Sequence, residues 1–455
     1  MIFDENSYDS FDRAEEIARY AHELYEDGKV AMSLIQLQEA LEINPSSSSL
    51  HFNKALALDS MNSFEEAIKE YKAALELTGD DLEALNSLAI DYTRIGLYDL
   101  AIETFEKIEN IDRDFEPSYC NRIIAYTEMN KHEKAEEMFY LAQQIKPDCA
   151  LCFYNIGNSL FIRGEYQKAI SCWIKTSKLE SDHPQINFRI AQAYWFDGDY
   201  QTSREYFLAE LRENPGDTDV IIDFGLFLLQ LGDIESAKEK FNRVLEFVPD
   251  HAQAMFYLGE IAFNKGNFSD AEQLFHKAIL NDNTLVGPNY RLAQYALQKA
   301  QIDLAREFLF EEMKLDPQES QALISMGSIF LQTGDYDYAT HCLLRAIDSD
   351  GDNPEPYYYL ALVSATRGLL EEADEFFGKA LDIDPNHIFT LKDSAILCLA
   401  TGKLNLAADR IEKAEKIIGS DSETKSLRRK IRLARLASKA EDIIFSAFTD
   451  KTKDN

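Results

Sequence analysis

The chain has 455 residues and is longer than most domains that have a single hydrophobic core. We therefore expect either several domains or a stack of repeats. Its 80 acidic residues exceed its 46 basic ones, giving a net charge of −34. This charge argues against nucleic-acid and anionic-lipid partners, because phosphate binding needs clustered Lys and Arg. No apolar run approaches the roughly 18 residues of a membrane span, so we expect no membrane insertion.

Residues 1–13 form an acidic lead-in that lacks the basic and apolar segments of a secretory signal. We therefore expect a cytoplasmic protein. The chain contains six cysteines, too few for a dense disulfide framework at this length, so reduced thiols are expected.

From residue 14 to residue 419 the sequence repeats every 34 residues. A column of small residues reads Ser33, Ala67, Ala101, Ala135, Ala169, Ser203, Ala237, Ala271, Ala305, Ala339, Ala373 and Ala407. A turn column reads Gly28, Asn62, Gly96, Asn130, Gly164, Gly198, Gly232, Gly266, Ala300, Gly334, Gly368 and Gly402. A column of large residues reads Leu37, Tyr71, Phe105, Phe139, Trp173, Phe207, Phe241, Phe275, Leu309, Leu343, Phe377 and Ile411.

The three columns predict one helical hairpin in each period. The turn column suits residues that accept a left-handed backbone. The small column suits places where two helices approach closely, and the large residues fill the gap between neighbouring hairpins. We therefore predict twelve consecutive pairs of amphipathic helices.

Repeat 5 carries the pattern most completely. Its residues and the end of the preceding unit supply Pro147, Phe153, Gly157, Tyr166, Ala169 and Trp173. This spacing resembles the tetratricopeptide repeat. Repeat 4 departs most from the pattern, with Arg122 and Ile123 where an aliphatic and a small residue are usual.

The resemblance implies an all-α fold, a right-handed superhelical α-solenoid of tandem helix-turn-helix repeats. The first helix of each repeat would line the concave side and carry the ligand contacts. Fixed positions on these helices give a predicted partner-binding groove of Tyr154, Asn158, Phe161, Phe188, Gln192, Trp195, Phe256, Glu260, Phe263, Tyr290 and Gln294.

The predicted groove has an apolar surface in which aromatic side chains are interspersed with the side-chain amides of Asn and Gln. These amides can form hydrogen bonds with a peptide backbone. We expect a protein or peptide partner with large apolar anchors and neutral or basic charge. We also expect that truncating a groove residue leaves the fold intact. Chaperone-binding members of the family hold a C-terminal carboxylate with a Lys and an Asn. Asn158 is present here, but Tyr154 replaces the Lys, so an acidic tail is not the expected ligand.

Cys149 and Cys152 have the C-x-x-C spacing of half a zinc site. The other half is missing from the sequence, because Cys120 and Cys172 stand alone at positions where packed apolar residues are usual. We therefore expect buried small side chains rather than a metal or redox site. No phosphate-binding loop, nucleophile elbow or H-E-x-x-H motif is found, so we expect neither an enzyme nor a cofactor.

Residues 420–448 should form a helical cap over the last repeat, followed by a flexible tail at 449–455. The cap is basic, with Lys425, Arg428, Arg429, Lys430, Arg432, Arg435 and Lys439. This basic face is either a solvated surface or a docking surface for an acidic partner or a second copy of the chain.

We predict a non-enzymatic scaffold or adaptor that binds a peptide or helix in its groove and assembles a multiprotein complex. Two alternatives stay open: a structural subunit that self-associates through its end caps or groove, and a substrate-recruiting subunit of an enzyme on another chain.

Overall fold

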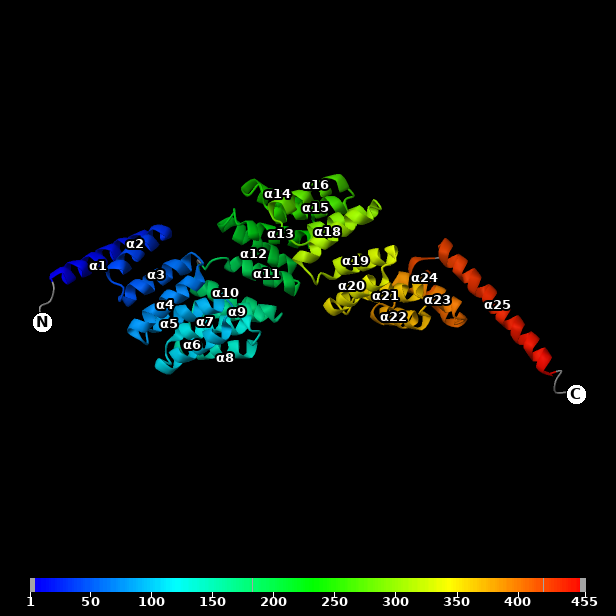
Figure 1. The fold of residues 1–455 in the computed structure, drawn as a ribbon, viewed down its shortest axis with the longest axis horizontal. Helices are drawn as coiled ribbons and strands as arrows, with labels where there is room; N and C mark the ends of the chain where they lie inside the picture. Colours follow the sequence, from blue (N-terminus) through cyan, green and yellow to red (C-terminus); the bar gives the residue numbers. More distant parts are fainter. Residues whose placement is uncertain (1–4, 182, 420, 451–455) are drawn as a thin grey trace. The chain divides into compact units, whose positions relative to one another are not determined.

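The computed structural model describes residues 5–181, 183–419 and 421–450, and their regular structure is entirely α-helical (Figure 1). The chain divides into two compact units that meet within one helix, at Phe227 and Leu228. We describe each unit by itself. None of the described helices combines the length and the apolar composition needed to cross a bilayer.

In the first unit the helices are α1 (Glu5–Glu26), α2 (Val30–Ile43), α3 (Ser48–Ser60), α4 (Phe64–Thr78), α5 (Leu82–Arg94), α6 (Tyr98–Ile111), α7 (Glu116–Glu128), α8 (His132–Ile145), α9 (Ala150–Ile162), α10 (Tyr166–Leu179), α11 (Ile186–Asp197) and α12 (Tyr200–Glu213). Helix α13 (Thr218–Gln230) contains the unit boundary.

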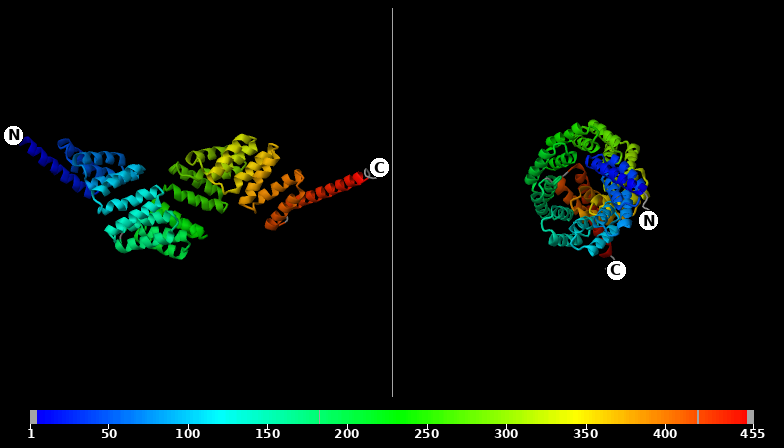
Figure 2. Two further views of the ribbon diagram at one scale, coloured as in Figure 1. Left: turned by 90° about the horizontal axis from the view of Figure 1, so that it is seen from below. Right: turned by 90° about the vertical axis from the view of Figure 1, so that its left-hand side faces the viewer.

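In the second unit the helices are α14 (Ile234–Phe247), α15 (Ala252–Asn264), α16 (Phe268–Asn281), α17 (Pro288–Gln298), α18 (Ile302–Leu315), α19 (Ser320–Thr333), α20 (Tyr336–Ser349), α21 (Pro354–Thr366), α22 (Leu370–Ile383), α23 (Ile388–Ala400), α24 (Leu404–Ile418) and α25 (Ser422–Asp450). Within each unit, neighbouring hairpins lie side by side in both views of Figure 2. The predicted tandem helix pairs are confirmed.

The turn column has one backbone conformation throughout. All twelve of its residues have positive φ, including Asn62 (59°), Asn130 (54°) and Ala300 (56°). A residue with a Cβ is sterically strained in this region of φ and ψ, which explains why nine of the twelve residues are glycine. The turn between the paired helices was therefore predicted correctly, even where the sequence lacks glycine.

The small column and the large column form the packed interior. All twelve small residues are buried, and all the large ones are buried except Phe139, which is half-buried. In the two repeats with serine, Ser33 and Ser203 donate hydrogen bonds to backbone carbonyls of the first helix of the same repeat, at 2.7 and 2.8 Å. The hydroxyl is thus accommodated in the core without an unpaired polar group.

Glycine appears on some first helices because the large residue lies directly against the backbone. A Cβ placed on Gly157 would lie 2.5 Å from Nε1 of Trp173, and one on Gly259 would lie 2.6 Å from the Phe275 ring. These glycines allow a bulky ring to pack at full depth.

Repeats 6 and 9 begin differently from the other repeats. Helices α11 and α17 start two residues later in the period, after Gln185 and Gly287 with φ of 55° and 112°. In both repeats a buried glutamate of the second helix accepts hydrogen bonds at the shortened N-terminus. Glu210 accepts from the N–H of Phe188 at 3.3 Å, and Glu312 accepts from the N–H of Tyr290 at 3.2 Å. These carboxylates satisfy backbone donors that the helix leaves free.

Repeat 4 keeps the hairpin despite its unusual sequence. Arg122 is buried on α7, and its guanidinium pairs with Glu106 at 3.1 Å and Glu109 at 2.9 Å on α6. Ile123 packs in the core beside it. Two carboxylates from the preceding helix therefore compensate the charge that replaces an aliphatic side chain.

Helix α25 covers the end of the last repeat. Leu427 and Ile431 pack on Ala395, Cys398 and Ile411 of α23 and α24. Arg428 pairs with Glu415 at 3.0 Å. The predicted N-terminal lead-in overlaps α1, which begins at Glu5, whereas residues 1–4 lie outside the described part. Most of the predicted tail, 451–455, also lies outside it, as does the side chain of Lys439.

Candidate partner-binding site

The predicted groove residues lie on four first helices, two in each unit. Tyr154, Asn158 and Phe161 are on α9, and Phe188, Gln192 and Trp195 are on α11. The remaining residues are in the second unit, on α15 and α17: Phe256, Glu260, Phe263, Tyr290 and Gln294.

In the first unit four rings form what we call the aromatic cluster: Phe161, Tyr166, Trp195 and Phe196. The Phe196 ring meets Phe161 edge to face at 5.5 Å between centroids, and it stacks on Trp195 at 5.4 Å and on Tyr166 at 5.8 Å. Aromatic pairs at such distances stabilise one another beyond their buried area. The cluster thus holds the last turns of α9 and α11 together.

Phe196 is the most exposed ring of this cluster, with 55% of its surface accessible. Ile162, next to Phe161 at the end of α9, is 57% exposed. Neither residue belongs to the predicted groove, because the fixed positions on each first helix end at Phe161 and Trp195. The signal was the second large apolar residue directly after Phe161 and Trp195.

A polar contact lies one turn before Trp195. The amide nitrogen of Gln192 donates to Oδ2 of Asp223 on α13 at 2.7 Å, and its oxygen accepts from Arg189 at 3.4 Å. Burial raises the pKa of Asp223 above its ordinary value. Both ends of this amide therefore already have partners within the chain.

The other residues of this set are less open than the aromatic cluster. Tyr154 packs on His183 with ring centroids 4.3 Å apart. Phe188 is buried against Phe207, and Asn158 is half-buried. Phe188 is therefore part of the hydrophobic core, and Tyr154 packs against the turn that contains His183.

In the second unit a guanidinium occupies the centre of the predicted groove residues. Arg291 forms a bidentate ion pair with Glu260, in which both N–O distances are 2.6 Å. It also donates a hydrogen bond to the side-chain oxygen of Gln294 at 2.8 Å. Gln294 in turn donates to the Tyr290 hydroxyl at 2.7 Å. Arg291 is not among the predicted groove residues, although it lies beside Tyr290 in the chain. This network leaves the Gln294 amide engaged at both ends.

The expectation that groove residues are not part of the core is wrong for several of them. Phe161 packs against the core cluster of repeats 4 to 6, and Phe256 and Phe263 pack against the core around Phe275. The physical reason is the length of the aromatic side chains, which reach back from the first helix to the large residue of their own repeat.

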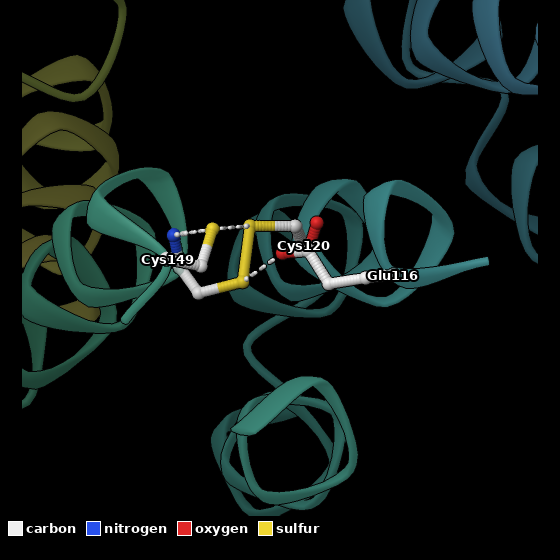
Figure 3. Close-up of side chains that lie close together, drawn as sticks. Glu116, Cys120 and Cys149 are labelled. Atoms are coloured by element: carbon white, nitrogen blue, oxygen red, sulfur yellow. Dashed lines mark hydrogen bonds between the residues drawn. A yellow bond between two sulfur atoms is a disulfide. The ribbon is translucent and has the colours of Figure 1, made fainter. Parts of the chain in front are cut away.

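The cysteines are also arranged differently from the prediction. Cys120 is not isolated: it lies with Cys149, Cys152 and Glu116 in one group, whose possible ligand atoms are all within 4.8 Å of one another (Figure 3). Cys120 and Cys152 form a disulfide. Cys172 is not part of this group. Stacking of α7 on α9 creates this proximity across 32 residues of sequence.

Two family models match the chain. One is described as tetratricopeptide repeat and matches residues 20–81, 52–114, 222–284 and 324–388. The other is described as YpiA-like, C-terminal tetratricopeptide repeats, and matches residues 184–251. Together they cover more than half of the chain. The chain is a tetratricopeptide repeat protein.

Among curated relatives, this tetratricopeptide repeat protein is 28% identical to protein CTR9 homolog of Arabidopsis thaliana over 137 residues, 30% of this chain and 12% of the relative. It is 24% identical to protein O-mannosyl-transferase TMTC3 of Homo sapiens over 206 residues, 44% of this chain and 20% of the relative. The chain thus matches only a small part of the length of these relatives.

Among solved structures, a chain of the APC/C hetero-tetramer Cut9-Hcn1 is 12% identical, with a TM-score of 0.49. The match covers 92% of this chain and 96% of that one.

Proposed function

We propose that this tetratricopeptide repeat protein is a non-enzymatic scaffold or adaptor that binds a partner peptide or helix on the first-helix surface of repeats 5 and 6. The aromatic cluster carries this proposal. Its exposed Phe196 ring stacks on the half-buried Trp195, and the exposed side chain of Ile162 directly follows Phe161 of the same cluster in the chain. Exposed aromatic groups of this kind are typical binding hot spots.

The chemistry of the surface favours a partner with a large apolar anchor. An anchor side chain that covers Phe196 would remove apolar surface from water at low entropic cost, because the cluster is already fixed by its own ring contacts. The preorganised rings would thus supply affinity, and the neighbouring polar groups would orient the segment.

The charge beside the cluster favours a neutral or basic partner. Asp197 follows Phe196, and Asp199 caps α12. Hydrogen bonds from the Thr202 side chain and backbone lower the pKa of Asp199, so it is ionised at neutral pH. These carboxylates attract Lys or Arg on the partner and repel an acidic segment.

A random-peptide phage library selected against the full chain tests this function. We expect selected peptides to share one or two large apolar residues flanked by neutral or basic ones. Competition with a soluble selected peptide should remove most of the phage. Selection of acidic peptides, or no enrichment over a helical control protein, would contradict the proposal.

Light scattering of the chain alone tests the competing explanation that the surface joins copies of this protein. A mass of one chain, 52.0 kDa, at all concentrations supports an external partner. A mass that rises with concentration, and no longer rises in a Phe196→Ala variant, would assign the surface to self-association.

A further inference from the structure

Four metal-ligating groups meet between the first helices of repeats 4 and 5. Glu116 and Cys120 lie one turn apart on α7, Cys149 is the N-cap of α9, and Cys152 lies in its first turn. We call these four residues the cysteine cluster. Figure 3 shows the Cys149 sulfur beside the sulfur of Cys120 and the Glu116 carboxylate beside the other sulfur of the disulfide.

The disulfide between Cys120 and Cys152 accounts for only part of this geometry. The third sulfur, of Cys149, lies 3.8 Å from the Cys120 sulfur. Oε1 of Glu116 lies 3.0 Å from the Cys152 sulfur. A disulfide sulfur has no proton to donate, whereas the Cys152 thiol of the reduced pair can donate a hydrogen bond to this carboxylate.

The donor set fits a divalent cation of the zinc class. Three sulfurs and one carboxylate oxygen are ligands that Zn²⁺ uses, and C-x-x-C is a common spacing in structural zinc sites. With zinc–sulfur bonds of about 2.3 Å, tetrahedral coordination places two sulfurs about 3.8 Å apart, the separation found between Cys120 and Cys149.

The surroundings also suit a structural metal. The two cysteines of the disulfide and Cys149 are buried, and Glu116 is half-buried. The backbone N–H of Cys152 points at the Cys149 sulfur at 3.4 Å. This donor and the N-terminus of α9 place partial positive charges beside the sulfur.

We propose that the reduced cysteine cluster binds one zinc-class ion through Glu116, Cys120, Cys149 and Cys152, and that this ion joins repeats 4 and 5. A dithiol reductant opens the disulfide by exchange: its two electrons and two protons pass to Cys120 and Cys152, and it leaves as its own disulfide. The three thiol protons then go to solvent as the metal binds. This proposal replaces the expectation of inert buried cysteines.

Cobalt(II) titration of the full chain, reduced with a dithiol and then freed of it without oxygen, tests the site. Wild type should bind one Co²⁺ per chain, with a sulfur-to-cobalt charge-transfer band and the visible bands of tetrahedral coordination. Zn²⁺ should displace the cobalt and abolish both signals. Cys172→Ser is the matched control, because Cys172 lies on the adjacent helix α10 outside the cluster, and it should behave as wild type.

Cys149→Ser should lose the stoichiometric band, with folding checked by circular dichroism. Glu116→Gln keeps all three sulfurs, so it should retain charge transfer while its visible bands shift. The proposal is overturned if reduced wild type shows no charge-transfer band, if Cys149→Ser binds as wild type does, or if Cys172→Ser loses the band as well.

Discussion

The ring of Phe196 lies edge to face against the ring of Phe161, with centroids 5.5 Å apart, so that the ends of α9 and α11 meet through two aromatic side chains. Phe161 also packs against the large Trp173 of its own repeat, at 5.7 Å. Phe196 instead has more than half of its surface open to solvent. One contact thus joins a ring that packs in the core to a ring that is mostly exposed.

This difference predicts different outcomes for two alanine variants. Phe161→Ala should lower the free energy of unfolding by about 2 to 4 kcal/mol, because it leaves a cavity beside Trp173. Phe196→Ala should change it by about 1 kcal/mol or less, because the ring is largely exposed. Urea unfolding followed by circular dichroism measures both. Equal losses would show that the two rings have the same structural role.

Helical glycines provide a test of the packed columns. Gly157→Ala should destabilise the chain by about 1 to 3 kcal/mol, because the new methyl would collide with Trp173. Gly378→Ala is the matched control on α22, where no atom lies within 4 Å of the added Cβ. It should instead stabilise by about 0.5 to 1 kcal/mol through helix propensity. A stable Gly157→Ala variant would refute the role assigned to the glycine.

The turn column predicts opposite effects for two reciprocal substitutions. Ala300 has φ of 56° and Gly334 has φ of 86° at the same point of successive repeats. Ala300→Gly should raise stability by about 1 kcal/mol, and Gly334→Ala should lower it by a similar amount, because only glycine adopts this region without steric cost. Thermal melts of the two variants beside wild type decide the question. Shifts of the same sign would contradict the assignment.

The buried carboxyl of Glu312 should make the stability of the folded chain depend on pH. Burial raises the pKa of this carboxyl in the folded chain, against the hydrogen bonds from the N–H groups of Gly287 and Tyr290. The folded state then binds the proton more tightly than the unfolded state does. Its contribution to stability therefore grows as pH falls towards the unfolded pKa and is lost as pH rises through the folded pKa.

The difference in melting temperature between wild type and Glu312→Gln isolates this group from the other carboxyls. We expect the difference to move in favour of wild type between neutral pH and about pH 5. A difference that is constant with pH would mean that Glu312 keeps its ordinary pKa on folding.

The 34-residue period allowed the fold to be predicted because each of its three columns has one steric cause: a left-handed turn, a close approach of two helices, or a gap between hairpins. The sequence identified the turn at Ala300 and the buried small position at Ser203, although neither is the usual residue. The late start of α17 was not predicted. Its cause, a backbone contact with Glu312, joins residues 22 to 25 positions apart.

The candidate sites were predicted less completely for a related reason. Cys120 stands alone in the sequence at a position where a packed apolar residue is usual, yet α7 and α9 stack directly and bring it to Cys152, 32 residues away. Arg291 was overlooked because its role depends on Glu260 in the preceding first helix. Contacts between first helices of adjacent repeats thus decide site chemistry that a column within one repeat does not reveal.

Calorimetric titration of a peptide selected from the phage library tests the central claim most directly, with wild type, Phe196→Ala and Phe310→Ala compared. Phe310 is the matched control, a phenylalanine that is 48% exposed on the second helix α18. We predict that Phe196→Ala weakens binding by about 2 kcal/mol, roughly 30-fold, while Phe310→Ala binds as wild type does. Unchanged affinity in Phe196→Ala, or equal losses in both folded variants, would contradict a binding surface at the aromatic cluster.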